Sequence, residues 1–340
     1  SADALAKLGY RQPEASFQAL HELQQSGRVL TLQAEGKARL EQFMPQLLQA
    51  CVESEDPDLT LTRVLPLVVA VVRRSAYLVL LLENPPALDE LVVLCGASPW
   101  IADQLARHPV LLDELLDRAS LYGAPDKAQV EDELRQQVAR LATDDLEAQM
   151  DAMRYFKASQ VLRVAASELA GRLPLMQVSD KLTWIAEVIL TQVLAAAWAD
   201  LTNKYGQPER ATSGSGFAIF GYGKLGGIEL GYGSDLDLVF VSDGADQGVT
   251  DGKRSIDNTV FYTRLGQRII HILETRMPQG QLYEVDMRLR PSGESGMLVA
   301  TLAGFEQYQQ DSAWTWEHQA LVRARHVAGD PDLARRAESI

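Results

Sequence analysis

Two aspartates stand one residue apart in Gly233-Ser234-Asp235-Leu236-Asp237-Leu238-Val239-Phe240. The residues after Asp235 are apolar and β-prone apart from Asp237, so the sequence predicts a strand. Because side chains alternate along a strand, both carboxylates point to one face, with Cα atoms ~6.5 Å apart, or two rises of ~3.3 Å. Two such carboxylates repel each other unless a cation lies between them. A hard divalent ion such as Mg²⁺ suits this position.

A glycine-rich run precedes the aspartates. It follows the strand-like residues 217–220 and reads GYGKLGGIELGYG over residues 221–233. Without Cβ atoms a backbone can approach a phosphate closely and direct N–H groups at it. A phosphate cradle followed by a metal-binding Asp-x-Asp is the layout of a nucleotidyl-transfer site.

Two other phosphate-binding motifs fit this run less well. The fingerprint Gly-x-Gly-x-x-Gly of dinucleotide binding must open a helix. Here three more glycines follow at once, which disfavours a long helix: Gly227, Gly231 and Gly233. A P-loop needs Ser or Thr after its lysine, whereas Leu225 follows Lys224.

A third acid belongs to a later stretch, residues 281–290, which we predict to be another strand. Its alternation places polar groups on one face: Glu284, Asp286, Arg288 and Arg290. Arginine binds phosphate oxygens through a bidentate fork. An acid with two arginines on one face therefore suits a site for both metal and phosphate.

The elements that position these residues differ between the two parts of the chain. Residues 1–205 have helical apolar spacing, and we expect an all-α domain of eight or nine helices. Prolines mark the expected breaks: Pro13, Pro45, Pro57, Pro85, Pro99, Pro109, Pro125 and Pro174. A polar, flexible stretch at 205–216 predicts the domain boundary. Residues 206–340 form the second domain, and their mixed element order predicts an α+β fold. We expect strands at 217–221, 235–241, 281–290 and 297–300, and helices at 259–274, 302–311 and 314–327.

Composition limits the class of function. The formal net charge of −14 disfavours nucleic acid as a partner, because phosphate contacts need clustered Lys and Arg. We expect no membrane segment, since Arg73 and Arg74 interrupt the apolar run 65–82, which we interpret as a buried helix. Two cysteines, Cys51 and Cys95, are expected to be reduced core thiols of a cytoplasmic protein. The chain begins without methionine, and we interpret it as a piece of a longer polypeptide.

Three stretches together resemble the family of bifunctional glutamine synthetase adenylyltransferase/adenylyl-removing enzymes, of the DNA polymerase β-like nucleotidyltransferase superfamily. They are FAIFGYGKLGGIELGYGSDLDLVF at 217–240, YEVDMRLRPSG at 283–293 and WTWEHQALVRAR at 314–325. Residues 97–100 and 108–116 resemble the family more loosely. The resemblance implies a nucleotidyltransferase domain after an all-α domain. It also implies that the chain holds one of the two catalytic halves of the full-length enzyme.

The resemblance also implies roles for residues. Asp235, Asp237 and Asp286 are the expected catalytic groups and the ligands of two Mg²⁺ ions, with Asp286 serving the ion that activates the attacking hydroxyl. The substrate ATP is expected to contact Gly226, Gly227, Ser234, Lys224, Arg288 and Arg290. Residues 314–321 resemble the C-terminal, adenylylating half, which transfers AMP to a tyrosine of glutamine synthetase. A PII-type signalling protein is a partner that we expect to bind regions absent from this chain.

Three alternatives remain open at the sequence level. The first is the half of the family's enzyme that removes AMP by phosphorolysis, which has a similar Asp-x-Asp strand. A nucleotidyltransferase for another acceptor is a second alternative. A helical interaction module with an inactive catalytic remnant is the third, and the three intact aspartates argue against it.

Overall fold

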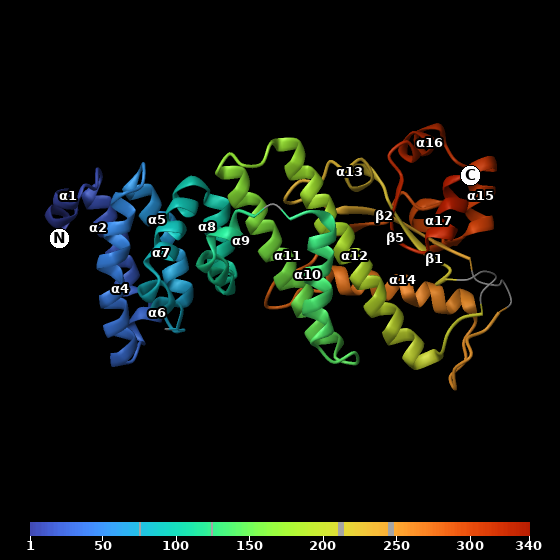
Figure 1. The fold of residues 1–340 in the computed structure, drawn as a ribbon, viewed down its shortest axis with the longest axis horizontal. Coiled ribbons are helices and arrows are strands. Elements are labelled where there is room, and N and C mark those ends of the chain that lie inside the picture. Colours follow the sequence, from blue (N-terminus) through green and yellow to red (C-terminus); the bar gives the residue numbers. More distant parts are fainter. Residues whose placement is uncertain (75, 124, 210–213, 244–247) are drawn as a thin grey trace. The chain divides into compact units, whose positions relative to one another are not determined.

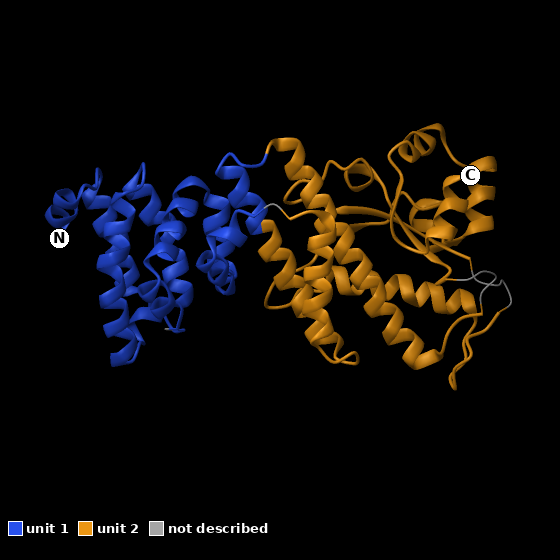
Figure 2. Ribbon diagram, in the orientation of Figure 1, with its two compact units in different colours: residues 1–124, 162–173 blue, residues 125–161, 174–340 orange. Residues whose placement is uncertain are grey.

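The computed structural model describes residues 1–74, 76–123, 125–209, 214–243 and 248–340 (Figure 1). The chain divides into two compact units, residues 1–124 with 162–173 and residues 125–161 with 174–340 (Figure 2). The domain boundary predicted after residue 205 lies within the second unit and stays a prediction. Of the predicted linker, residues 210–213 lie outside the described residues.

The first unit is built from short helices. They are α1 (Ala2–Leu8), α2 (Pro13–Gln25), α3 (Gly27–Leu30), α4 (Ala34–Val52), α5 (Pro57–Val71), α6 (Ala76–Glu83), α7 (Pro85–Ala97), α8 (Pro99–Arg107), the 3₁₀ helix η1 (Pro109–Leu116) and α9 (Arg118–Leu121). Several begin with proline at the first helical position, where its missing N–H costs nothing. We predicted a helix break at Pro45, but this residue lies inside α4. Two buried residues of α4, Phe43 and Leu47, flank it in the sequence.

Three further helices follow, of which the last two are the longest described: α10 (Lys127–Ala139), α11 (Leu146–Leu169) and α12 (Leu175–Tyr205). Within the described part of residues 1–205 every regular element is a helix, as predicted. The twelve α-helices and one 3₁₀ helix found there exceed the eight or nine expected. The excess comes from very short helices such as α3 and α9, which are too short to show a helical period.

We predicted that the apolar run 65–82 forms one buried helix. This run instead forms parts of two helices, α5 and α6. The two arginines, Arg73 and Arg74, are exposed between them. Among the described residues, α12 alone meets a length and composition test for crossing a bilayer. Of its apolar window, 67% is buried inside the protein, and core helices pass the same test.

A small mixed sheet forms the centre of the second unit (Figure 1). Its strands are β1 (Phe217–Gly221), β2 (Leu236–Ser242), β3 (Val285–Asp286), β4 (Val299–Thr301) and β5 (Arg325–Gly329). The order is β3-β2-β1-β5, with β1 antiparallel to both of its neighbours. Strands β3 and β4 both pair with β2 in parallel. The fold is therefore mixed α and β, and mostly helical.

Helices complete this unit: α13 (Gly223–Gly226), α14 (Asn258–Glu274), the 3₁₀ helix η2 (Gly293–Ser295), α15 (Leu302–Asp311), α16 (Thr315–Leu321) and α17 (Pro331–Glu338). The helix predicted at 259–274 is confirmed as α14, and four apolar residues at helical spacing on it are fully buried: Phe261, Leu265, Ile269 and Ile272. Phe217 on β1 lies 5.5 Å from Phe240 on β2 and stacks on Tyr262 of α14, measured between ring centroids. These aromatic rings join the sheet to the helix behind it.

Two element predictions are wrong. The strand predicted at 281–290 is only two residues long, because the chain turns after Asp286. The helix predicted at 314–327 ends at Leu321, and residues 325–329 form β5 instead. There the pairing of β5 with β1 outweighs the helical preference of the local sequence.

Candidate active site

Asp237 and Asp286 lie side by side on neighbouring strands. They are direct register partners in the parallel pair of β2 and β3, so their side chains project from the same face of the sheet. Asp235 lies two residues before Asp237, just ahead of β2. The three acids that the sequence analysis singled out are thus gathered at one end of β2.

The short strand β3 is held in place by α14 and β2. The Glu274 carboxylate at the end of α14 accepts the N–H of Val285 at 3.2 Å, and the N–H of Leu236 donates to the Glu284 carbonyl at 2.9 Å. The end of α14 is itself capped by buried Arg154 on α11. Its guanidinium donates to the carbonyls of Ile272 at 3.0 Å, Thr275 at 2.6 Å and Gly280 at 3.0 Å. These bonds satisfy carbonyls that a helix end leaves without partners.

The acids differ in electrostatic environment. Burial raises the pKa of Asp237, and the nearby carboxylates of Asp235 and Asp286 raise it further. Hydrogen bonds from Arg288 lower the pKa of Asp286. The Arg288 Nε donates to Asp286 Oδ2 at 2.8 Å, and the backbone N–H of Arg288 donates to Oδ1 at 2.8 Å. Asp286 is therefore ionised at neutral pH and already paired with a cation.

The glycine-rich run makes a tight turn against Asp237. Helix α13 is one turn long, which agrees with the expectation that no long helix follows β1. Gly223 has a φ of +52°, and a Cβ placed there would lie 2.2 Å from Asp237 Oδ2. The Tyr222 N–H donates to the Asp237 carbonyl at 2.9 Å. Only glycine fits at position 223, because both the conformation and the space exclude a side chain.

The residues predicted to bind nucleotide differ in how closely they are packed and in whether they are exposed. A Cβ on Gly226 would lie 1.7 Å from the Arg323 carbonyl, whereas one on Gly227 would meet nothing closer than 3.3 Å. Lys224 is exposed, and its positive charge lowers the pKa of Asp237. The Ser234 hydroxyl accepts the N–H of Gly231 at 3.0 Å and so closes a turn just before the acids.

The sequence pattern predicted that Arg288 and Arg290 share one strand face. This prediction is wrong, because both residues lie after the end of β3. Arg288 is 74% exposed and folds back onto Asp286. Arg290 donates to the carbonyls of Met287 at 2.8 Å and Glu294 at 3.1 Å, and so stabilises the turn that follows β3. The early end of β3 is the reason, since alternation stops where the strand stops.

The acid group fits a hard divalent cation in its chemistry and placement. Asp237 and Asp286 offer carboxylate oxygens from one sheet face, and their mutual repulsion raises the pKa of Asp237. Over the described ranges, no group of three or more His, Cys, Asp or Glu side chains has the geometry of a formed metal site. Both carboxylate oxygens of Asp286 instead accept hydrogen bonds from Arg288.

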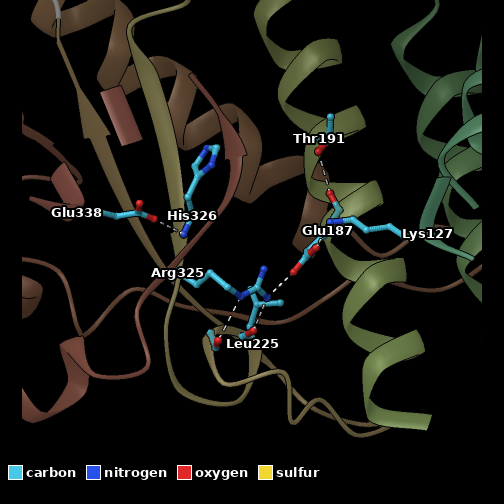
Figure 3. A network of polar contacts seen from close by, with 8 residues as sticks. Lys127, Glu187, Thr191, Leu225, Arg325, His326 and Glu338 are labelled. Atoms are coloured by element: carbon cyan, nitrogen blue, oxygen red, sulfur yellow. Dashed lines mark hydrogen bonds and ion pairs between the residues drawn. The ribbon is translucent and has the colours of Figure 1, made fainter. Parts of the chain in front are cut away.

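Sequence reasoning missed a polar network behind the glycine turn (Figure 3). Arg325 on β5 donates to the carbonyls of Leu225 at 3.0 Å and Gly226 at 3.3 Å, and it pairs with Glu187 of α12. Lys127 pairs with the same carboxylate. The signal for Glu187 was present, since a lone acid in an apolar helix is rarely buried without a partner. Arg325 carried no such signal, because its segment was predicted to be helical.

The aromatic residues near α16 also differ from expectation. The helix predicted over 314–327 would place Trp314 and Trp316 in the core, but they are 70% and 55% exposed. Glu317 has a structural role, since it accepts the N–H of Trp314 at 2.7 Å and the hydroxyl of Tyr308 at 2.8 Å. The indoles belong to a segment with little packing, since none of the residues of α16 is buried.

Comparison with known proteins gives a consistent result. The family profile of glutamate-ammonia ligase adenylyltransferase matches residues 88–340. A bifunctional glutamine synthetase adenylyltransferase/adenylyl-removing enzyme of Pseudomonas putida is 55% identical over 339 residues, covering 99% of this chain and 35% of the relative. Proteins of the same name from Pseudomonas aeruginosa and Thioalkalivibrio sulfidiphilus are 56% and 53% identical, covering 96% and 97% of this chain and 33% and 34% of the relatives. The chain spans about a third of the length of these relatives.

Proposed function

The chain belongs to the glutamate-ammonia ligase adenylyltransferase family, and from this we propose that it transfers AMP from ATP to a tyrosine hydroxyl of glutamine synthetase. The observation that carries the proposal is the register pairing of Asp237 with Asp286, with Gly223 packed against Asp237. We further propose that the sheet and its glycine turn are a DNA polymerase β-like nucleotidyltransferase domain, acting in the cytoplasm.

Each part of the reaction is assigned to residues of the chain. The backbone of Gly226 and Gly227 and the hydroxyl of Ser234 bind the triphosphate, with Lys224 supplying positive charge. Asp235, Asp237 and Asp286 would hold two Mg²⁺ ions, which neutralise the charge that develops on the phosphoryl oxygens. The new bond forms between the tyrosine oxygen and the α-phosphorus, and the bond from that phosphorus to the departing pyrophosphate breaks.

Arg288 and Asp286 have linked roles in this proposal. Asp286 accepts the proton of the tyrosine hydroxyl, which requires Arg288 to release its carboxylate. The exposed Arg288 side chain is free to turn toward the nucleotide and bind phosphate oxygens. Arg290 is assigned a supporting role, because its guanidinium already stabilises the turn after β3.

The direction of the reaction has one competing assignment. The relatives' names include adenylyl removal. In that reaction the same three acids would serve phosphorolysis, in which phosphate takes AMP from the tyrosine and ADP is released. The resemblance of residues 314–321 to the adenylylating half favours transfer. A PII-type protein is proposed as a regulator that binds other regions of the full-length enzyme.

A labelling experiment tests the function. The chain is incubated with ATP labelled at the α-phosphate, Mg²⁺ and unmodified glutamine synthetase, and label on the synthetase is measured. We expect transfer by the unmodified chain and none by Asp237→Asn. If adenylylated synthetase and phosphate instead yield ADP while no transfer occurs, the removing activity is correct. Equal transfer by Asp237→Asn would refute the assignment of the acids.

A further inference from the structure

A buried carboxylate on α12 is linked through Arg325 to Leu225 in the glycine turn (Figure 3). Glu187 on α12 has only 4% of its side chain exposed and pairs with both Lys127 and Arg325. A buried carboxylate is retained only when charges and hydrogen bonds compensate its loss of water. Each Glu187 oxygen pairs with one cation, and Arg325 has further donors that do not contact Glu187.

The Arg325 guanidinium also contacts the turn itself. The Arg325 Nη2 donates to the Leu225 carbonyl at 3.0 Å, and its Nε donates to the Gly226 carbonyl at 3.3 Å. A guanidinium is planar and presents its donors in a fixed fork, so it can bind a carboxylate and two carbonyls together. Figure 3 shows Arg325 lying between Glu187 and the turn.

The turn has little room to move between these partners. On one side, Gly223 is so close to Asp237 that a Cβ would overlap its carboxylate. On the other, Arg325 holds the carbonyls of Leu225 and Gly226, and the Arg323 carbonyl packs against Gly226. The distance between the turn and the acids is therefore set by Arg325, whose own position is set by Glu187.

We infer that Glu187 and Arg325 are a positioning pair, which fixes the glycine turn and with it the backbone surface that meets the phosphates of the nucleotide held at the acids. The pair touches neither nucleotide nor metal ion. The nucleotide part of this inference rests on the proposed function, whereas the part that concerns the turn does not. A positioning error of about 1 Å can cost on the order of 10²-fold in rate, so such a pair matters for activity.

The first test measures the turn without nucleotide. Backbone amide hydrogen exchange is followed at residues 222–230 in the unmodified chain and in the double variant Glu187→Gln/Arg325→Gln, which leaves no buried unpaired charge. We expect exchange there to become about tenfold faster or more, while helices such as α4 and α14 keep their protection. Unchanged exchange at the turn, or an equal increase everywhere, would overturn the inference.

The second test separates positioning from charge pairing. Arg325→Lys keeps an ion pair with Glu187 but cannot form the fork to both carbonyls. We expect this variant to bind Mg·ATP about tenfold more weakly by calorimetry and to raise the KM for ATP more than it lowers kcat. If Arg325→Lys keeps both the exchange protection of the turn and the Mg·ATP affinity of the unmodified chain, the role of the guanidinium is overturned.

Lys127→Met is the matched control. It removes the other cation from Glu187 but no contact with the turn. We expect this variant to match the unmodified chain in amide exchange at residues 222–230 and in affinity for Mg·ATP. A loss equal to that of Arg325→Lys would overturn the inference in favour of simple charge balance. If the unmodified chain binds no Mg·ATP while the double variant still loosens the turn, the proposed function fails and the structural role of the pair stands.

Discussion

Asp237 and Asp286 face each other across the parallel pair of β2 and β3, although they lie far apart in the sequence. Sheet pairing brings the two carboxylates together, and Arg288, two residues after Asp286, forms its ion pair with Asp286. This arrangement of acids disfavours the charged form of Asp237, whose pKa is raised by burial and by its acidic neighbours. The acid group is therefore a place where folding stability and chemistry oppose each other.

This opposition predicts the behaviour of Asp237→Asn. Removing one of the like charges relieves repulsion in the metal-free chain, so we expect a rise in melting temperature of about 1–3 °C, as for a change on the order of 1 kcal/mol. Nucleotidyl transfer should be lost in the same variant. Calorimetric melting without divalent ions measures the first effect, and a lower melting temperature than that of the unmodified chain would contradict it.

A second prediction concerns Gly223. Gly223→Ala forces a Cβ into the space of the Asp237 carboxylate at a positive φ, so we expect transfer to fall by about 10²-fold and stability by about 1–3 kcal/mol. Gly233→Ala is the control in the same run, because a Cβ there meets nothing within 4 Å. Initial rates with labelled ATP distinguish them, and similar rates for both variants would argue against the close packing at Asp237.

Arg154 provides a prediction about stability alone. In Arg154→Met several carbonyls lose a buried donor, so we expect the free energy of unfolding to fall by about 3 kcal/mol or more. Arg107→Gln removes only an exposed pair with Asp103 and should cost about 0.5 kcal/mol or less. Urea denaturation of the two variants gives both values. A small effect at Arg154 would show that water replaces the lost donor.

The buried Lys157 predicts a dependence of stability on pH. Burial lowers the pKa of its ammonium group to about 8, although the group donates to the Leu282 carbonyl and lies 4.0 Å from the Tyr283 ring centroid. Between pH ~8 and ~10.5 the unfolded chain holds this proton and the folded chain does not, so stability rises with pH in that window. We expect Lys157→Met to flatten this rise by an amount on the order of 2–3 kcal/mol. Parallel stability curves for the two proteins would contradict the lowered pKa.

Much of the site was accessible from the sequence because its signals are local. The alternation around Asp235 and Asp237 predicts their common face, and the glycines predict a tight turn rather than a long helix. Both inferences need only the geometry of a strand and the missing Cβ atoms. The pairing of Asp286 with Asp237 depends on the order of the strands, which no local pattern contains.

The errors arose where distant partners decide the local structure. We predicted a helix as far as residue 327, yet residues 325–329 pair with β1 as an edge strand, and this places Arg325 next to the glycine turn. The strand at 281–290 stops early because Asp286 and Arg290 stabilise a turn through their own side chains. The burial of Glu187 is likewise a property of the packed unit rather than of its helix.

The parallel pairing of β3 and β4 with one strand has a practical consequence. Both join β2, with β3 pairing at its start and β4 at its end, so the chain between them, residues 287–298, leaves and returns along the same strand. Lengthening this connection changes neither the order nor the direction of any strand, and loop closure grows costlier only slowly with length. The connection therefore tolerates added length wherever the contacts of Arg288 with Asp286 and of Arg290 with the turn are kept.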